Sequence, residues 1–321
     1  MKAIVINKFG EAEVMKLKDI KRPVPAADEI LVKVYASGVN PVDLVVREGS
    51  SAALRYNLHL PMILGWDTAG TIEEFGSSVT AFHKGDAVYG VPNFPGNGSY
   101  AEYCIAKADQ FALKPNKIGF IEAAGVPLAA LTAWTALFEY GNLKSGQRVL
   151  IQGASGSVGS FAVQFAKSIG VYVIGTASGE NFDYLKQIGV DELIDYKTQK
   201  FEELVHNVDI VLEASSVRDN NERLKSVKVL KEKGILVSVN TDFPYNDEVM
   251  KALAVKKVNG ELAANQPRQK WLEEIAQLID NGKVQISIGK VFPLEKAVEA
   301  HNAIKSNNVR GKIILQVREQ K

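Results

Sequence analysis

Short apolar runs rich in branched residues alternate with amphipathic segments through the second half of the chain. The runs are RVLIQG (148–153), VYVIGT (171–176), ELIDY (192–196), VDIVLEAS (208–215) and GILVSV (234–239). Strands of this kind are typical of a parallel sheet buried on both faces. The segments between them have helical periodicity, the last over 220–234, and Gly170, Gly189 and Gly234 close three of them. The alternation predicts an α/β fold with a doubly wound parallel sheet.

The first part of the chain has a different texture. Short β-rich runs such as EILVKVYAS and TAGTIEEF are separated by turn clusters such as RPVPAADE and PNFPGNGS. This pattern predicts a β-rich, antiparallel, barrel-like domain. The terminal run GKIILQV has the same texture, so we expect the end of the chain to return to this domain. The predicted domains are therefore 1–122 with 266–321, and 123–265.

Composition narrows the function classes. The 321 residues carry a formal net charge of +1, which argues against a nucleic-acid or anionic-membrane surface. Cys104 is the single cysteine, so no disulfide forms within the chain and no multi-cysteine metal site is possible. The longest uncharged stretch, 123–138, is shorter than the roughly 20 residues that a membrane span needs. No signal peptide is evident, and we expect a cytoplasmic protein.

A glycine-rich turn, QGASGSVGS, joins the first of the buried runs to a helix. Gly156 fits the place where the backbone must approach a diphosphate, and Gly159 the place where helix and strand pack closely. Ala154 stands where the familiar pattern has glycine, with Gly153 one position earlier. Because the turn lies inside a strand–helix–strand unit, we interpret it as a dinucleotide site rather than a plain tight turn. The predicted contacts are Gly153, Ser155, Gly156, Ser157, Val158 and Gly159.

The stretch GTASGEN (175–181) bears on which dinucleotide is bound. An NAD site usually has Asp or Glu about 20 residues past the glycines, to hold the ribose hydroxyl. Here Thr176 and Ser178 leave that position without a carboxylate, and Ser178 and Asn181 offer hydrogen bonds to a 2′-phosphate. These residues favour NADPH. Glu180 and the absence of Arg or Lys in this loop argue the other way, and Ser178 has the alternative role of a helix cap.

Several further motifs occur in a fixed order along the chain: ASGVNPVDLVVREG (36–49), LGWDTAGTIEEFGSSVTAFHKGDAVYG (64–90), GSYAEY (98–103), GVPLAALTAWTAL (125–137) and LIDY (193–196). With the glycine turn, they make the chain resemble the zinc-free quinone oxidoreductase-like branch of the medium-chain dehydrogenase/reductase superfamily. The resemblance covers essentially the whole length. It implies a GroES-like catalytic domain and a Rossmann domain, with the active site in the cleft between them.

The resemblance also bears on metal binding. Zinc-dependent relatives hold a catalytic zinc through two cysteines and a histidine, and the matching positions here are Asn40, Trp66 and Leu128. None of these is a credible zinc ligand. We therefore expect no metal, and a reaction that needs no Lewis acid.

Three residues are the candidates for catalysis. Asn40 matches an Asn beside the nicotinamide in zinc-free relatives and would donate to a developing oxyanion; its alternative role is a loop-capping amide. Asp43 matches a position kept polar, for which capping is the other reading. Tyr56 is a candidate proton donor, with solvent as the alternative.

The resemblance extends the cofactor contacts beyond the glycine turn. Thr132 matches a threonine on the nicotinamide side, with a buried helical Thr as the alternative. Tyr196 matches a tyrosine near the adenosine phosphate. Val239 and Asn240 follow the fifth strand, where backbone contacts to nicotinamide are expected. The position of a basic residue in some quinone reductases is Gly179 here.

These inferences lead to one function and two alternatives. The leading hypothesis is an NADPH-dependent, zinc-independent reductase of a quinone or an α,β-unsaturated carbonyl. The alternatives are an NADPH-binding module with little turnover and a metal-dependent alcohol dehydrogenase. From the resemblance we also expect a homodimer, with no nucleic-acid or membrane partner.

Overall fold

The computed structural model describes residues 1–50, 58–306 and 309–319, which divide into two compact units. The first unit is 1–128, 267–282 and 286–321, and the second is 129–266 and 283–285. The first boundary thus falls six residues later than 122/123 because the segment before it packs on the first unit. The backbone N–H of Leu128 donates to the Asp67 carboxylate at 2.6 Å.

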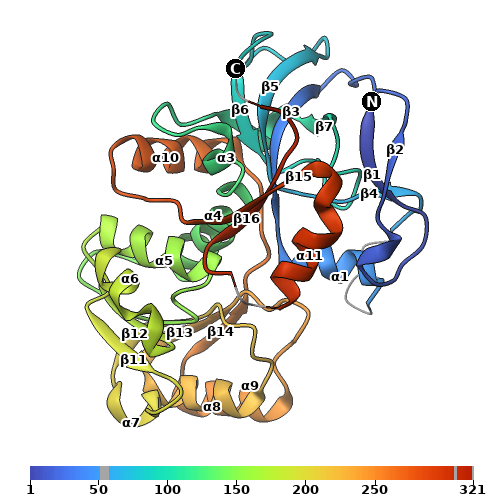
Figure 1. Ribbon diagram of the computed structural model, residues 1–321. Coiled ribbons are helices and arrows are strands. Elements are labelled where there is room, and N and C mark those ends of the chain that lie inside the picture. The colour runs from blue at the N-terminus through green and yellow to red at the C-terminus, as the bar shows by residue number, and fades with distance from the viewer. Residues whose placement is uncertain (51–57, 307–308, 320–321) are drawn as a thin grey trace. The chain divides into compact units, whose positions relative to one another are not determined.

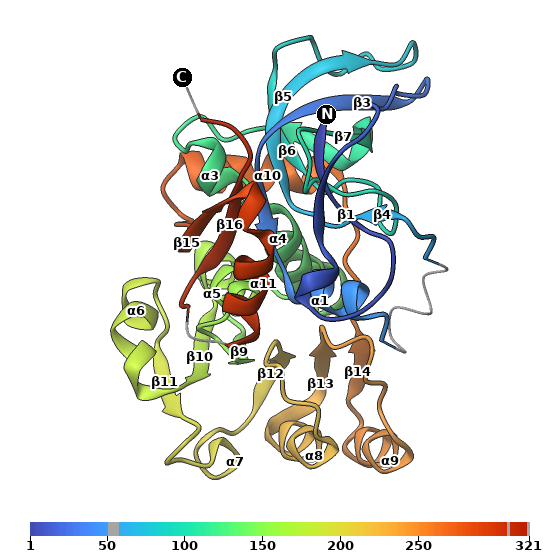
Figure 2. The same ribbon diagram turned by 45° about the vertical axis from the view of Figure 1, so that its right-hand side comes forward.

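The second unit is built on one parallel sheet. Its strands are β9 (Arg148–Gln152), β10 (Tyr172–Ala177), β11 (Glu192–Asp195), β12 (Val208–Glu213), β13 (Leu230–Ser238) and β14 (Asn259–Leu262). They are ordered β11-β10-β9-β12-β13-β14, all parallel. Figure 2 labels all six strands, and Figure 1 shows the same sheet from another side. The strand order reverses between β9 and β12, the place where such sheets bind ligands at their carboxyl ends. The doubly wound prediction is confirmed.

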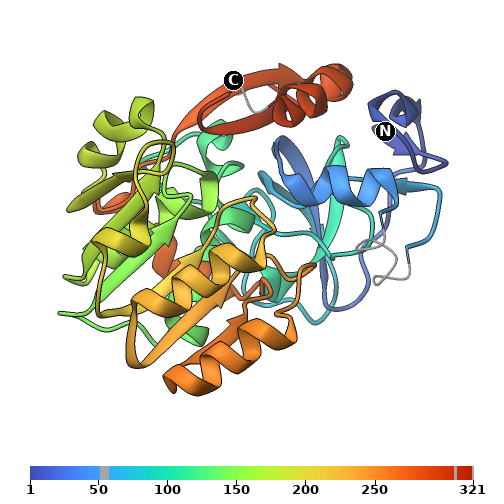
Figure 3. The same ribbon diagram turned by 90° about the horizontal axis from the view of Figure 1, so that it is seen from below.

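Helices cover both faces of this sheet. They are α4 (Pro127–Trp134) with the π-helix η3 (Thr135–Tyr140), α5 (Ser157–Ser168), η4 (Gly179–Asn181), α6 (Phe182–Gln187), α7 (Phe201–Leu204), α8 (Asn220–Val229) and α9 (Asp247–Lys256). Phe201, Val227 and Leu253 from α7, α8 and α9 share one apolar cluster with Leu150 and Val211 of the sheet. Helices α8 and α9 lie side by side, in yellow and orange in Figure 3, and α5 packs on β9 and β10.

The helix expected over 220–234 is shorter than predicted. It ends at Val229, because Leu230 already pairs with Val208 as the first residue of β13. Gly170 and Gly189 adopt the left-handed conformation expected of helix-closing glycines, with φ of +79° and +98°. Gly234 does not, and the positive φ falls on Lys233 instead.

The first unit is mainly antiparallel. Its strands are β1 (Lys2–Ile6), β2 (Lys16–Asp19), β3 (Glu29–Val39), β4 (Met62–Ile63), β5 (Thr68–Phe75), β6 (Ala87–Gly90), β7 (Tyr103–Lys107), β8 (Phe111–Leu113), β15 (Ile288–Pro293) and β16 (Lys312–Gln316). Its helices are η1 (Ala12–Val14), α1 (Pro41–Glu48), η2 (Ala108–Gln110), α3 (Phe120–Ala123), α10 (Gln269–Asp280), η5 (Leu294–Lys296) and α11 (Ala297–Lys305).

Strand β3 organises this unit. It pairs antiparallel with β5, β7 and β16, so the C-terminal strand lies beside the N-terminal ones as its texture predicted (Figure 2). Ile30 and Val32 of β3 share an apolar core with Ile72 of β5, Val88 of β6 and Phe111 of β8. Within the described ranges, no helix of either unit is long and apolar enough to cross a membrane.

Candidate active site

Asn40, Asp67 and Lys312 form a buried triangle of hydrogen bonds in the first unit. The Lys312 ammonium donates to Asn40 Oδ1 at 2.6 Å and to Asp67 Oδ2 at 2.8 Å, and Asn40 Nδ2 donates to Asp67 Oδ2 at 2.8 Å. The side chain of Lys312 is 4% exposed and that of Asp67 is fully buried. An ammonium only donates and a carboxylate only accepts, so the triangle fixes which end of the Asn40 amide is oxygen.

Strand register brings these three residues together. Asn40 directly follows β3, Asp67 directly precedes β5, and Lys312 opens β16. Since β3 lies between β5 and β16, all three residues reach one end of the sheet. A Cβ on Gly38 would lie 2.7 Å from Asp67 Oδ2, so only glycine leaves room for that carboxylate.

Asp43 belongs to a second, adjoining network. Asp43 Oδ2 accepts the backbone N–H of Asn40 at 2.7 Å, which caps α1, and also the Tyr100 hydroxyl at 3.0 Å. Tyr100 Oη lies 3.2 Å from His301 Nε2, and Arg47 donates to His301 Nδ1 at 3.0 Å. Because a guanidinium only donates, Nδ1 is an acceptor and the ring proton is on Nε2, directed at Tyr100.

Burial sets the protonation of this second network. It raises the pKa of the Asp43 carboxyl to about 7, against smaller opposing effects of its hydrogen bonds from Asn40 and Tyr100. Burial, with a smaller contribution from the Arg47 charge, lowers the pKa of His301 to about 3. At neutral pH the ring is therefore uncharged. Asp43 caps α1, which was the predicted alternative to a catalytic role for this residue.

The remaining candidates of the first unit lie in different places. Tyr56 is outside the described residues. The Trp66 ring is buried and meets Phe94 edge to face at 4.9 Å between centroids. Of the three positions that match zinc ligands, Asn40 belongs to the triangle, Trp66 directly precedes Asp67 in the chain, and the Leu128 N–H donates to Asp67 Oδ1. Over residues 1–50, 58–306 and 309–319, no three His, Cys, Asp or Glu side chains are placed to hold a metal.

The glycine turn of the second unit has the geometry of a phosphate cradle. Gly156 is exposed and is the N-cap of α5, so the first N–H groups of the helix have no partner within it. A Cβ on Gly159 would lie 2.2 Å from the Gly153 carbonyl oxygen, which explains that glycine by close packing. Ser155, Ser157 and Val158 are each partly exposed at the same turn. These residues fit a dinucleotide diphosphate.

The end of β10 differs in detail from the expected NADPH loop. Thr176 Oγ1 accepts the Gly153 N–H at 3.3 Å, so this side chain holds the turn. The Ser178 hydroxyl donates to Glu180 at 2.8 Å and accepts from Asn181 at 2.9 Å. The Lys197 ammonium, which was not predicted as a site residue, lies 4.0 Å from the Glu180 carboxylate. The Glu180 carboxylate therefore bonds to Ser178, and the Lys197 cation lies beside that carboxylate.

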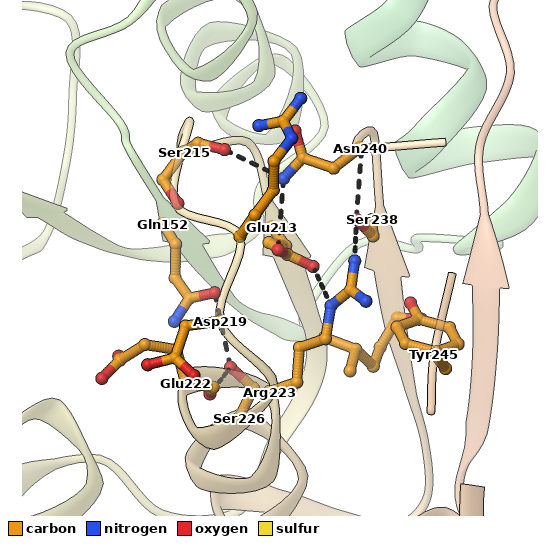
Figure 4. Close-up of polar contacts among 12 residues, drawn as sticks. Gln152, Glu213, Ser215, Asp219, Glu222, Arg223, Ser226, Ser238, Asn240 and Tyr245 are labelled. Carbon is orange, nitrogen blue, oxygen red and sulfur yellow. Dashed lines mark hydrogen bonds and ion pairs between the residues drawn. The ribbon is translucent and has the colours of Figure 1, made fainter. Parts of the chain in front are cut away.

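A buried polar cluster supports the carboxyl ends of β12 and β13 (Figure 4). The Arg223 Nε donates to Glu213 at 2.9 Å, and its Nη2 donates to Ser238 at 3.3 Å. Asn240 Nδ2 donates to Glu213 and to the Ser215 carbonyl, and the Val239 N–H donates to the Glu213 carbonyl. The side chain of Asn240 thus fixes the loop. This cluster was not predicted, because Glu213 ends a strand and Arg223 lies on the following helix, with no local pattern that pairs them.

Two further cofactor candidates lie elsewhere in the second unit. Thr132 is partly buried on α4 and its hydroxyl accepts from Asn265 Nδ2 at 3.0 Å. Tyr196 follows β11 and its side chain is 61% exposed, which leaves its ring available to a ligand.

A doubly wound sheet with a glycine-cradled helix, together with a β-rich unit completed by the C-terminal strand, defines the medium-chain dehydrogenase/reductase class. Two family models match: "Alcohol dehydrogenase GroES-like domain" over residues 26–116 and "Zinc-binding dehydrogenase" over 188–315. The chain belongs to the quinone oxidoreductase-like group of the medium-chain dehydrogenase/reductase superfamily, and it is an oxidoreductase of the NAD(P)H-dependent type.

Three similar proteins carry this assignment. Quinone oxidoreductase of Sus scrofa is 33% identical over 331 residues, covering 98% of this chain and 97% of that protein. The quinone oxidoreductase structure from Coxiella burnetii is 35% identical, with a TM-score of 0.90 over 99% of both chains. The Escherichia coli quinone oxidoreductase complexed with NADPH is 27% identical, with a TM-score of 0.87 over 99% of this chain and 100% of that one.

Proposed function

We propose that this protein is an NADPH-dependent reductase that transfers hydride to a quinone or an α,β-unsaturated carbonyl without a metal ion. The observation that carries the proposal is the Asn40–Asp67–Lys312 triangle. It contains Asn40, which matches the first zinc ligand of metal-dependent relatives by sequence, and an indole (Trp66) and a leucine (Leu128) match the other two. The Lys312 ammonium already bonds to Asn40 and Asp67 in this triangle. Its positive charge disfavours the binding of a metal cation beside it.

The chemistry needs few groups from the protein. A bound nicotinamide would supply the hydride, and the acceptor takes it at a conjugated carbon or a quinone oxygen. Charge then develops on a carbonyl oxygen, and one proton completes the reduction. Asn40 Nδ2 carries two hydrogens, one of which serves Asp67, so the second is the donor assigned to that oxygen.

Solvent supplies the proton in this proposal, because enolates and hydroquinone anions are readily protonated by water. Tyr56 is the alternative donor. A Tyr56→Phe variant with an unchanged turnover number would support solvent, whereas a large loss of turnover would assign the proton to Tyr56.

The NADPH preference rests on Ser178, Asn181 and Lys197. These side chains offer two neutral donors and one cation to a 2′-phosphate near the end of β10. Glu180 opposes them, because its carboxylate takes the Ser178 hydroxyl and repels a phosphate. An NADPH-binding protein with little turnover is the second candidate, and NADPH binding without acceptor-dependent oxidation would establish it.

The proposal includes a homodimer in the cytoplasm. Strand β14 is an edge of the described sheet, and α9 beside it exposes Met250 and Val255 at 52% and 76%. Light scattering tests this with wild type and Val255→Glu. A dimeric wild type and a monomeric variant support the proposal, and a monomeric wild type overturns it. Cell fractionation tests the cytoplasmic location. The single cysteine supports this location, because a chain without a disulfide fits a reducing compartment.

The function is tested by cofactor oxidation with purified protein and a panel of quinones and alkenals. We expect oxidation of NADPH that depends on the acceptor and persists in a chelator. Failure with every acceptor would overturn the reductase proposal, and stoichiometric zinc in the active protein would overturn its metal-free part.

A further inference from the structure

Lys312 has no assigned part in the proposed reaction, although it contacts the residue proposed to stabilise the oxyanion. Its ammonium lies 2.6 Å from Asn40 Oδ1, which is short for a hydrogen bond from nitrogen. The side chain is 4% exposed, so water screens this contact poorly. A lysine buried this deeply is rare unless it is paired, and here Asp67 is its partner.

We propose that Lys312 is a positioning residue that acts through Asn40, an inference that rests on the proposed function. The ammonium on the amide oxygen draws electron density from the amide nitrogen and makes the Nδ2 hydrogens better donors. Asp67 accepts one of these hydrogens and thereby fixes the orientation of the amide group. The second hydrogen is thereby aimed and strengthened. Lys312 itself does not contact the acceptor.

The geometry separates this role from simple packing. A structural ion pair would need only Lys312 and Asp67, whereas here the Lys312 contact to Asn40 is the shorter of its two bonds. The two oxygens of Asp67 serve different partners, since Oδ1 accepts the Leu128 N–H and Oδ2 accepts from Lys312 and Asn40. The arrangement therefore fixes the amide from both of its ends.

A double-mutant cycle tests the inference with the full-length protein. We expect Lys312→Met to lower kcat about tenfold or more while the dissociation constant for NADPH stays within about twofold. Lys312→Arg keeps the cation and should recover most of kcat. In an Asn40→Ala background, Lys312→Met should cost less than about twofold more. An equal loss in both backgrounds, or an unchanged kcat in folded Lys312→Met, would overturn the inference.

Two additions keep the test decisive. If Lys312→Met fails to fold, Asp67→Asn with Lys312→Met removes both buried charges together and should show the same loss of kcat. Lys290→Met is the matched control, because Lys290 is exposed on β15 and pairs with Ile313 in the same sheet. It should change kcat by less than about twofold.

A readout without turnover separates this inference from the proposed function. If wild type reduces no acceptor, the reductase proposal fails, and side-chain amide exchange by NMR then decides the role of Lys312. The Asn40 amide signal is assigned by its loss in Asn40→Ala. We expect its protection from exchange to fall about tenfold in Lys312→Met and less than about threefold in Lys312→Arg. Unchanged protection in Lys312→Met would overturn the inference.

Discussion

Lys312 and Asn40 are 272 residues apart in the chain, yet the ammonium of one donates to the amide oxygen of the other at 2.6 Å. The contact exists because β16 returns to pair with β3, with Ile313 opposite Val39. The chain thereby places a cation beside the amide that matches the first zinc ligand of metal-dependent relatives.

Asn40→Ala should lower kcat roughly 100-fold, because it removes the donor proposed to face the developing oxyanion. Steady-state kinetics with a quinone checks this, and NADPH affinity should change little. Asn302→Ala, which removes an exposed amide from α11 of the same unit, is the control and should retain full activity. Full activity in Asn40→Ala would leave the amide with a structural role only.

Substitutions of the two glycines in the turn should affect different properties, cofactor affinity for Gly156 and stability for Gly159. Gly156→Asp puts a preferred capping residue at the exposed N-cap of α5, so the fold should keep its stability. Its carboxylate takes the free N–H groups and repels a diphosphate, so NADPH affinity should fall about 100-fold. Gly159→Ala should instead cost about 2 kcal/mol of unfolding free energy, because its Cβ meets the Gly153 carbonyl. Titration and urea unfolding distinguish the two; tight NADPH binding by Gly156→Asp would rule out this cradle.

Glu180→Gln should shift cofactor preference toward NADPH. The change removes a carboxylate that bonds to Ser178, one of the residues proposed to contact the 2′-phosphate. We expect kcat/KM for NADPH relative to NADH to rise about threefold to tenfold, a modest effect because Glu180 is exposed. Asp183→Asn, on the exposed surface of α6, is the control for a general loss of negative charge. A ratio that rises equally in both variants would remove Glu180 from cofactor selection.

The buried pair Asp43 and His301 should give opposite pH dependences of stability. Asp43 has a pKa raised from 3.8 to about 7, so its protonation stabilises the fold at low pH and this contribution is lost as pH rises to 7. His301 has a pKa lowered from 6.5 to about 3, so its contribution is present above pH 6.5 and is lost on acidification toward pH 3. Between these limits the two contributions largely cancel.

Urea unfolding of single variants separates these two contributions. The stability difference between wild type and His301→Gln should rise by about 1.4 kcal/mol per pH unit from pH 4 to 6. The difference between wild type and Asp43→Asn should fall at a similar rate. Parallel pH profiles in all three proteins would contradict the assignment of these pKa values.

Local patterns in the sequence predicted the parallel sheet and its glycine turn, because the strand, the turn and α5 are contiguous in the chain. The predicted end of helix α8 was wrong, because helical periodicity in the sequence continues past Val229. In the structure Leu230 pairs with Val208 of another strand, and this pairing ends the helix. Asn40 was found by resemblance alone, whereas Lys312 and Gly38 acquire their roles from strand register across the chain. Glu213 and Arg223 could not be paired beforehand, since only the fold buries them together.

Metal-free hydride transfer is tested most directly by acceptor-dependent oxidation of NADPH, measured with purified, metal-depleted protein in the presence of a chelator. We expect that a quinone or an enone supports steady oxidation, that added zinc does not increase the rate, and that Asn40→Ala abolishes most of it. Oxidation that appears only when zinc is restored would show that the reaction needs the metal and would overturn the proposed mechanism.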